Sequence, residues 1–322
     1  MRAASATSID PDDPLRGLTL GEVPDPAVPP GWLRVTVRAA SLNHHDLWTL
    51  RGVGITADRL PMVLGCDAAG VLADGREVVV HSVIGDPEAG RGDETLDPRR
   101  SLLSEVHQGT FADYVVVPEQ NVLDKPSELS FAEAACLPTA WLTAYRMLAT
   151  KSGLRTGDTV LVQGAGGGVA TAAIQLASVL GFRVWATSRT EDKRDRALQL
   201  GAHQVFESGA RLPERVDAVL ETVGAATWAH SLKSLRPGGT VVVSGATTGS
   251  NPPADLSRVF FLQLNIVGST MGTRSELAAL LDLCVDTGLR PTIDHTYPLT
   301  EARAALERLA AGDVIGKLVL TP

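Results

Sequence analysis

The sequence predicts an α/β protein in which a small β-rich half precedes a doubly wound parallel sheet. From about Pro126 onward, strand-like apolar runs alternate with helical stretches, a pattern that builds a parallel sheet covered on both faces. Before about Val122, short β-type runs are separated by turn residues, which is typical of a small β-rich barrel. A glycine-rich turn between a strand and a helix lies near the middle of the chain and indicates which kind of parallel sheet to expect.

This turn follows the apolar run Thr159–Val162 and precedes an Ala-rich helical stretch that ends at Gly181, a natural helix C-cap. Four glycines among five residues let the chain turn sharply and let backbone N–H groups approach a pyrophosphate, to which the helix N-terminus adds a partial positive charge. The third glycine of the usual fingerprint is an alanine here, a substitution that the fingerprint allows. We therefore predict a Rossmann dinucleotide-binding domain whose cofactor-binding turn consists of Gly164, Gly166, Gly167, Gly168, Val169 and Ala170.

The end of the second strand, Phe182–Thr187, is where NAD and NADP are distinguished. An acidic residue there would bind the ribose 2′-hydroxyl of NAD. The chain continues instead with Ser188 and Arg189, and Glu191 follows Ser188 at the spacing of a helix capping box rather than of a ribose ligand. Ser188, Arg189 and Lys193 are suited to hold a 2′-phosphate, so we predict NADP(H) rather than NAD.

The other apolar runs complete a sheet of six strands, the size of a full dinucleotide-binding sheet. The further strands are expected at residues 204–206, 216–221, 239–243 and 264–268, with helices at 226–235 and 275–285. The strands expected in the first half are 32–40, 70–72, 77–80 and 114–117. The polar stretch 81–109 is expected to be an exposed or partly disordered loop. The last part, 297–320, reads strand, helix, strand, and either extends the sheet or returns to the first domain.

Composition and charge exclude several classes of protein. A chain of 322 residues with 44% hydrophobic residues indicates two domains of a soluble globular protein. The net charge of −8, without a long Lys/Arg block, argues against a nucleic-acid surface. The sequence has no membrane-length apolar run and no signal-peptide apolar region, so we expect a cytoplasmic protein. Cys66, Cys136 and Cys284 are too scattered to form a disulfide framework.

Three motifs of the first half occur in the order found in a known family: Ala39–Trp48, Leu64–Val71 and Gly109–Pro118. With the central glycine turn and the closing segment Gly316–Leu320, they make the chain resemble the medium-chain dehydrogenase/reductase superfamily, in particular its quinone oxidoreductase-like and zinc-type alcohol dehydrogenase-like members. The resemblance implies a GroES-like catalytic domain (residues 1–123 and 293–322), a Rossmann domain (124–292) and an active site in the cleft between them. It also implies a homodimer through the last strand of the sheet, near residues 264–269.

Some members of the superfamily bind a catalytic zinc and others do not. The resemblance places Asn43, Cys66 and Thr139 where zinc alcohol dehydrogenases typically have Cys, His and Cys. Asparagine is a poor zinc ligand and threonine a rarer one, whereas a catalytic zinc usually needs three protein ligands. The stretch 81–109, where some relatives carry a structural-zinc lobe of four cysteines, has none. We therefore predict no bound metal.

An unorthodox metal site is the alternative, since His44, His45, Asp46 and Cys66 include the residue types that bind zinc. Two adjacent histidines on an extended segment point apart, however, and adjacency alone does not supply a tetrahedral arrangement. We interpret His44 as a cofactor-facing or surface histidine and Cys66 as a small buried residue.

Asn43, His45 and Trp48 are the catalytic candidates. The Asn43 amide is suited to hold a ribose, a nicotinamide amide or a substrate carbonyl. His45 matches the position of the Ser/Thr in the proton relay of zinc enzymes, and histidine passes protons near neutral pH. Trp48 is either a wall of the substrate pocket or plain core. His81 and His107 have no motif around them, and we expect both to be solvated.

The resemblance alone adds further residues to the cofactor site. They are His44, Thr139, Val223, Gly245, Ala246, Met271, Gly272 and Lys317.

These observations predict a zinc-independent, NADPH-dependent oxidoreductase that reduces a quinone or the activated C=C of an α,β-unsaturated carbonyl. Oxidising a plain alcohol is difficult without a metal to stabilise its alkoxide, whereas an enone places negative charge on an oxygen that hydrogen-bond donors can stabilise. Two alternatives stay open: an alcohol dehydrogenase with zinc in a remodelled site, and a non-catalytic NADP(H)-binding redox sensor.

Overall fold

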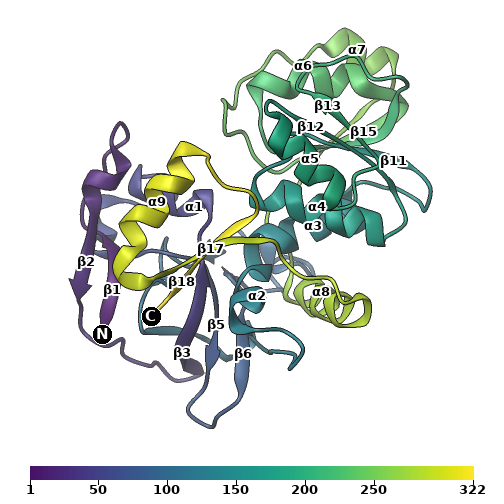
Figure 1. Ribbon diagram of the computed structural model, residues 1–322. Coiled ribbons are helices and arrows are strands. Elements are labelled where there is room, and N and C mark those ends of the chain that lie inside the picture. The colour runs from purple at the N-terminus through teal and green to yellow at the C-terminus, as the bar shows by residue number, and fades with distance from the viewer. The chain divides into compact units, whose positions relative to one another are not determined.

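The computed structural model describes all 322 residues, which form two compact units (Figure 1). The first unit consists of Met1–Leu142 and Met271–Pro322, and the second of Thr143–Thr270. The first unit extends beyond the GroES-like boundaries expected above because helix α2 (Phe131–Ala135) packs against strands β3 (Trp32–Ser41) and β5 (Asp67–Val71).

The first unit is rich in strands, as its turn-punctuated sequence predicts. Besides β3 and β5, its strands are β1 (Arg2–Ala6), β2 (Leu18–Glu22), β4 (Met62–Val63), β6 (Glu77–Val80), β7 (Val83–Ile84), β8 (Ser101–Leu102), β9 (Tyr114–Pro118), β10 (Val122–Asp124), β17 (Ile293–Pro298) and β18 (Lys317–Thr321). The main sheet has the order β10-β6-β5-β3-β18-β17, with β9 also paired to β3, and β2-β1-β4 form a smaller sheet. The C-terminal strands therefore return to the first unit, because β18 pairs with β3.

The first unit has two short helices, α1 (His44–Leu50) and α2, and two longer ones, α8 (Arg274–Thr287) and α9 (Ala302–Ala311). Helix α3 (Leu142–Arg146) begins at Leu142, where the first segment of this unit ends. One face of α9 buries Ala302, Ala305 and Leu306 in a core that includes Val35 and Leu320 of the sheet. That spacing of three and four residues is the apolar stripe of an amphipathic helix.

The stretch between His81 and Gly109 is only in part the exposed loop that its polar composition predicts, since residues 86–89, 91 and 92 are exposed. Strands β7 and β8 pair within it, with Val83 opposite Leu102. Leu103 has no exposed surface and Thr95 is 1% exposed. The prediction was wrong for the segments next to β7 and β8, because backbone pairing, which composition does not report, holds them against the rest of the unit.

The second unit is the doubly wound sheet that the alternating pattern predicts. Its parallel strands are β11 (Thr159–Val162), β12 (Arg183–Ser188), β13 (Gln204–Glu207), β14 (Val216–Glu221), β15 (Leu235–Val243) and β16 (Asn265–Gly268). Their order is β13-β12-β11-β14-β15-β16, with β16 at one edge. The helices are α4 (Gly168–Val179), α5 (Glu191–Gln199), α6 (Ala225–Ser234) and α7 (Leu256–Phe261). Leu161, Trp185 and Val241 are fully buried in its core. Crossing a bilayer requires a longer and more apolar helix than any in this protein.

Candidate functional site

The glycine-rich turn of the second unit has the geometry of an anion cradle. Gly164 has φ +74°, where any other residue would be strained, and a Cβ there would lie 2.8 Å from Val223 Cγ2. Helix α4 begins at Gly168 after the N-cap Gly167. A Cβ on Gly167 would meet nothing within 4 Å, so this side of the turn is open. The first N–H groups of a helix lack intrahelical partners, so the start of α4 is suited to bind an anion such as a pyrophosphate.

Other expected cofactor residues gather at the same edge of the sheet. Val223 follows β14 and lies against the turn, as its distance from Gly164 shows. Gly245 and Ala246 follow β15, and a Cβ on Gly224 would lie 2.8 Å from Ala246 Cα. The carboxyl ends of adjacent parallel strands therefore bring Gly164, Val223 and Ala246 together, where open α/β sheets bind their ligands.

The end of β12 differs in one detail from the prediction. Ser188 is the buried last residue of the strand, and the N-cap of α5 is Thr190, so the expected capping box of Ser188 and Glu191 is wrong. Pairing of Ser188 with Glu207 of β13 keeps Ser188 in the sheet. Arg189 is exposed, and the Lys193 side chain passes over the turn, since a Cβ on Gly166 would lie 2.8 Å from Lys193 Cδ.

In the first unit, the candidates near residue 43 begin a helix rather than an extended segment. Asn43 is the N-cap of α1, and its backbone N–H donates to Asp46 Oδ2 at 2.8 Å. The prediction that His44 and His45 lie on an extended segment is therefore wrong. Successive helical residues point about 100° apart, so His44 is exposed while the His45 side chain is only 11% exposed. Trp48, one turn after His45, is half-buried.

Asp67, which sequence reasoning did not single out, is the centre of a buried polar network. It has no exposed surface. Its Oδ2 accepts hydrogen bonds from Asn43 Nδ2 and Ser41 Oγ, both at 2.8 Å. Its Oδ1 accepts hydrogen bonds from Thr139 Oγ1 at 2.5 Å and from Ser82 Oγ at 3.2 Å. The available signal was a carboxylate inside the apolar stretch Leu64–Val71, because a buried charge needs partners.

Lys317 supplies the compensating positive charge. The side chain is buried, and its Nζ lies 3.7 Å from Asp67 Oδ2. The same Nζ donates to Asn43 Oδ1 at 2.6 Å and to the Leu42 carbonyl oxygen at 2.5 Å. Both ends of the Asn43 amide are therefore engaged, one by the carboxylate and the other by the ammonium group.

The three positions matched to zinc ligands come together around this network. Asn43 Nδ2 lies 3.6 Å from Cys66 Sγ, and Cys66 Sγ lies 3.4 Å from Thr139 Oγ1. Thr139 is in a π-helical turn, Leu137–Trp141. Burial, and then the charge of Asp67, raise the pKa of the Cys66 thiol well above its usual value. With the amide and the hydroxyl already hydrogen-bonded to Asp67, these residues do not fit the three-ligand zinc site of the alcohol dehydrogenases.

His45 is held by a residue from the segment between β8 and β9. Its Nε2 lies 3.1 Å from Glu105 Oε1, while Glu105 Oε2 accepts a hydrogen bond from the Leu102 backbone N–H at 3.1 Å. Glu105 was missed because it is 60 residues from His45 in the chain. His45 Nδ1 and Asp46 Oδ1 are buried without a hydrogen-bond partner in the protein. Burial raises the pKa of Asp46 to about 7.

The other histidines and the segment before α8 take different positions. His81 is 1% exposed, and its Nε2 donates to the Gly272 carbonyl oxygen at 2.9 Å, so the expectation of a solvated histidine was wrong. His107 is half-buried against Trp32, with ring centroids 5.1 Å apart. Met271 is buried, with φ +49°. His81 thus fixes the backbone at one of the expected cofactor-lining positions.

Two family models match the chain in the order of its parts. The alcohol dehydrogenase GroES-like domain matches residues 29–127, and the zinc-binding dehydrogenase model matches residues 168–286.

Individual relatives align over nearly the whole chain. Acryloyl-coenzyme A reductase of Metallosphaera sedula is 30% identical, over 95% of this chain and 97% of the relative. Quinone oxidoreductase of Homo sapiens is 29% identical, over 89% of this chain and 88% of the relative. The crystal structure of an NAD-dependent alcohol dehydrogenase superposes with a TM-score of 0.92 at 35% identity, covering 100% of both chains. With a β-rich unit followed by a parallel sheet that carries the glycine-rich turn, the chain belongs to the medium-chain dehydrogenase/reductase superfamily, whose members are oxidoreductases that use a nicotinamide dinucleotide.

Proposed function

We propose that this protein is an NADPH-dependent oxidoreductase that reduces a quinone or the activated C=C of an α,β-unsaturated carbonyl without a catalytic zinc. One observation carries the proposal. The positions matched to zinc ligands hold Asn43, Cys66 and Thr139, and the amide and hydroxyl among them are hydrogen-bonded to the buried Asp67. The names of the relatives, an acryloyl-coenzyme A reductase and a quinone oxidoreductase, support the same reaction class.

The choice of substrate follows from where negative charge develops. A bound reduced nicotinamide supplies a hydride, which a conjugated acceptor takes up while negative charge moves to its carbonyl oxygen. Hydrogen-bond donors suffice to stabilise that oxygen. A plain alcohol would need a cation beside its alkoxide, and the ammonium group of Lys317 is already engaged by Asp67 and Asn43.

His45 is the side chain best placed to donate the proton that the reduction consumes. Glu105 fixes its ring through Nε2, at 3.1 Å. Trp48 lies on the same side of α1 as His45 because the two residues are three positions apart, and we propose it as a wall of the substrate pocket. Asn43, with both ends of its amide engaged, acts as a positioning residue for Asp67 and Lys317.

The proposal is tested by following NADPH consumption with a quinone, an enone and an aldehyde, each with and without a chelator. A primary alcohol with NADP⁺ tests the reverse direction. We expect turnover of the quinone or the enone that the chelator does not lower. Chelator-sensitive alcohol or aldehyde turnover would instead establish the alternative, a zinc alcohol dehydrogenase. Tight NADPH binding with no turnover of any acceptor would establish a non-catalytic sensor.

The preference for NADP(H) is proposed to depend on Arg189, which is exposed at the end of β12. Replacing Arg189 by Ala is expected to raise the KM for NADPH about tenfold, because one charge-assisted hydrogen bond to a phosphate contributes about 1.5–3 kcal/mol. The KM for NADH should stay unchanged, since NADH lacks the 2′-phosphate. Arg196→Ala, in the last turn of α5, is the matched control. An unchanged ratio of the two KM values in Arg189→Ala would remove this role.

The partner is proposed to be a second copy of the chain, paired along the edge strand β16. Ile266 of that strand is 47% exposed. Helix α7, which precedes it, exposes Phe260 by 71% and Phe261 by 79%. Large exposed aromatic side chains next to an unpaired strand edge are typical of an interaction surface. This surface consists of α7 and β16.

We expect a dimer in sedimentation velocity, and we expect the double substitution Phe260→Ser, Phe261→Ser to convert it to a monomer. Leu198→Ser is the control, because Leu198 is 44% exposed but lies on α5. A monomeric unmodified protein, or a double variant that stays dimeric, would contradict the assignment of this surface.

A further inference from the structure

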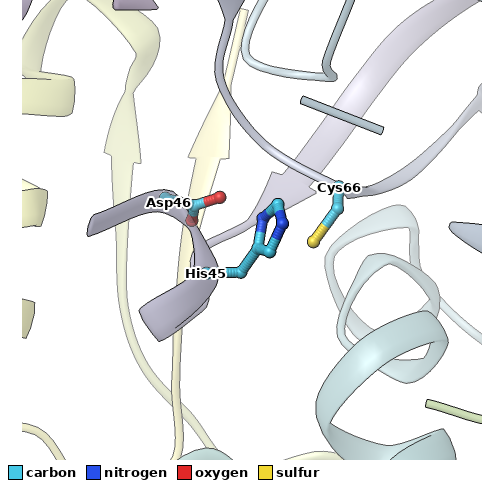
Figure 2. A group of neighbouring side chains, drawn as sticks. All are labelled: His45, Asp46 and Cys66. Carbon is cyan, nitrogen blue, oxygen red and sulfur yellow. The ribbon is translucent and has the colours of Figure 1, made fainter. Parts of the chain in front are cut away.

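Three side chains of zinc-binding type meet at the start of α1, and they are not the set matched by family resemblance. They are His45, Asp46 and Cys66, and their ligand atoms lie within 4.8 Å of one another. Figure 2 shows the imidazole ring of His45 between the carboxylate of Asp46 and the thiol of Cys66. Only Cys66 belongs to the three positions that correspond to the zinc ligands of alcohol dehydrogenases. One nitrogen, one oxygen and one sulfur donor make a set typical of Zn²⁺ or Co²⁺.

Two of the three side chains have a buried polar atom without a hydrogen-bond partner. Asp46 has no exposed surface, and its Oδ1 has no hydrogen-bond partner. His45 Nδ1 is likewise buried without a partner. Buried polar atoms are almost always paired, so two orphans on adjacent residues require an explanation. A cation that accepts a lone pair from each would satisfy both.

The second polar atom of each of these two side chains already has a partner, which leaves Asp46 Oδ1 and His45 Nδ1 available. Asp46 Oδ2 accepts the Asn43 backbone N–H at 2.8 Å, so only Oδ1 remains. His45 Nε2 lies 3.1 Å from Glu105 Oε1. A carboxylate on one ring nitrogen fixes the tautomer whose other nitrogen carries a lone pair, an arrangement found around metal-ligating histidines. Glu105 therefore leaves His45 Nδ1 available as a ligand.

The backbone supports the same arrangement. His45 and Asp46 lie in the first turn of α1, and Cys66 directly precedes β5. Both elements belong to the first unit. Ligands on helix and strand ends are held more precisely than ligands on loops. From these contacts we propose that His45, Asp46 and Cys66 bind a divalent transition-metal cation, with Zn²⁺ as the reference ion.

Metal binding by this cluster stands apart from the proposed reduction, although the two share His45. The lone pair of His45 Nδ1 cannot bind a cation and carry a proton at the same time. If His45 donates the proton as proposed above, occupancy by Zn²⁺ removes the donor, so Zn²⁺ inhibits the reductase and a chelator restores it. That consequence rests on the proposed function, whereas binding of the metal does not.

The binding test uses the full-length protein, stripped with a chelator and titrated with Co²⁺. We expect the near-ultraviolet charge-transfer absorption of a cysteinate–Co²⁺ bond, and we expect equilibrium dialysis to give one Zn²⁺ per chain. Cys66→Ser should abolish the absorption, and Asp46→Asn should weaken Zn²⁺ binding at least about tenfold. Cys284→Ser is the matched control, because Cys284 is also fully buried but lies in α8.

Circular dichroism identifies any variant that does not fold, and His45→Gln then provides a second ligand substitution. Absence of the charge-transfer band in the unmodified protein would overturn the site, and so would a band that Cys66→Ser retains. Turnover of the stripped protein is measured separately. Loss of turnover on stripping would contradict the zinc-independent reaction while leaving the metal site supported.

Discussion

Replacing Lys317 by Met is expected to lower the free energy of unfolding by about 3–5 kcal/mol, because it leaves a buried carboxylate without its counter-charge. Asp67 has no exposed surface, and the ammonium nitrogen of Lys317 lies 3.7 Å from its Oδ2. The Met side chain retains most of the apolar volume of Lys, so the decrease in the free energy of unfolding is due to the lost charge and its hydrogen bonds. The measurement is urea-induced unfolding followed by fluorescence.

A double-mutant cycle isolates the pair from other effects. Lys317→Met combined with Asp67→Asn removes both charges, and we expect the double variant to be more stable than Lys317→Met alone. Arg76→Met is the control on an exposed ion pair, since Arg76 is 54% exposed beside Asp74, and it should change stability little. A Lys317→Met variant within about 1 kcal/mol of the unmodified protein would show that Asp67 does not depend on this charge.

The second large effect is expected in cofactor binding. Gly167→Val should weaken NADPH binding at least about 100-fold, equivalent to about 2.7 kcal/mol, while leaving the fold intact. A Cβ on Gly167 would meet no protein atom within 4 Å, and the residue has φ −71°, which valine adopts without strain. The valine side chain would occupy the space that we assign to the pyrophosphate, so the substitution destabilises only the NADPH-bound state.

Isothermal titration calorimetry with NADPH, together with the thermal unfolding midpoint without cofactor, checks this prediction. Gly21→Val is the control, because Gly21 also has no protein atom near its Cβ position but lies on β2 of the other unit. If Gly167→Val bound NADPH as tightly as the unmodified protein, the pyrophosphate could not lie against this turn.

The sequence was sufficient to predict an element wherever the residues that determine its structure are all close together in the chain. The turn from Thr159 to Gly181 is of this kind, because the apolar run, the glycines and the helical stretch are neighbours in the chain. The alternation of strands and helices over the second unit gave the six-stranded parallel sheet for the same reason. Capping chemistry was present near residue 43, but the prediction overlooked it. Asn43 and Asp46 have the spacing of a helix start, and recognising it would have placed His44 and His45 on a helix.

Elsewhere, competing local signals could not be ranked without the sheet. Ser188 and Thr190 are both good N-cap residues. Pairing with β13 keeps Ser188 extended, so the helix begins after Thr190. The stretch 81–109 reads as exposed because it is polar, yet contacts such as His81 with Gly272, 191 residues away in the chain, bury part of it.

The sequence by itself therefore determined the parallel sheet and the glycine-rich turn, and the family resemblance singled out Asn43, Cys66 and Thr139 as positions that depart from a zinc site. Only the tertiary structure decided what those side chains contact. Lys317 reaches Asn43 across 274 residues of chain, and Asp67 gains its partners from four separate segments. Hydrophobic periodicity reports which residues are buried, whereas the pairing of buried charges depends on distances that only the folded chain fixes.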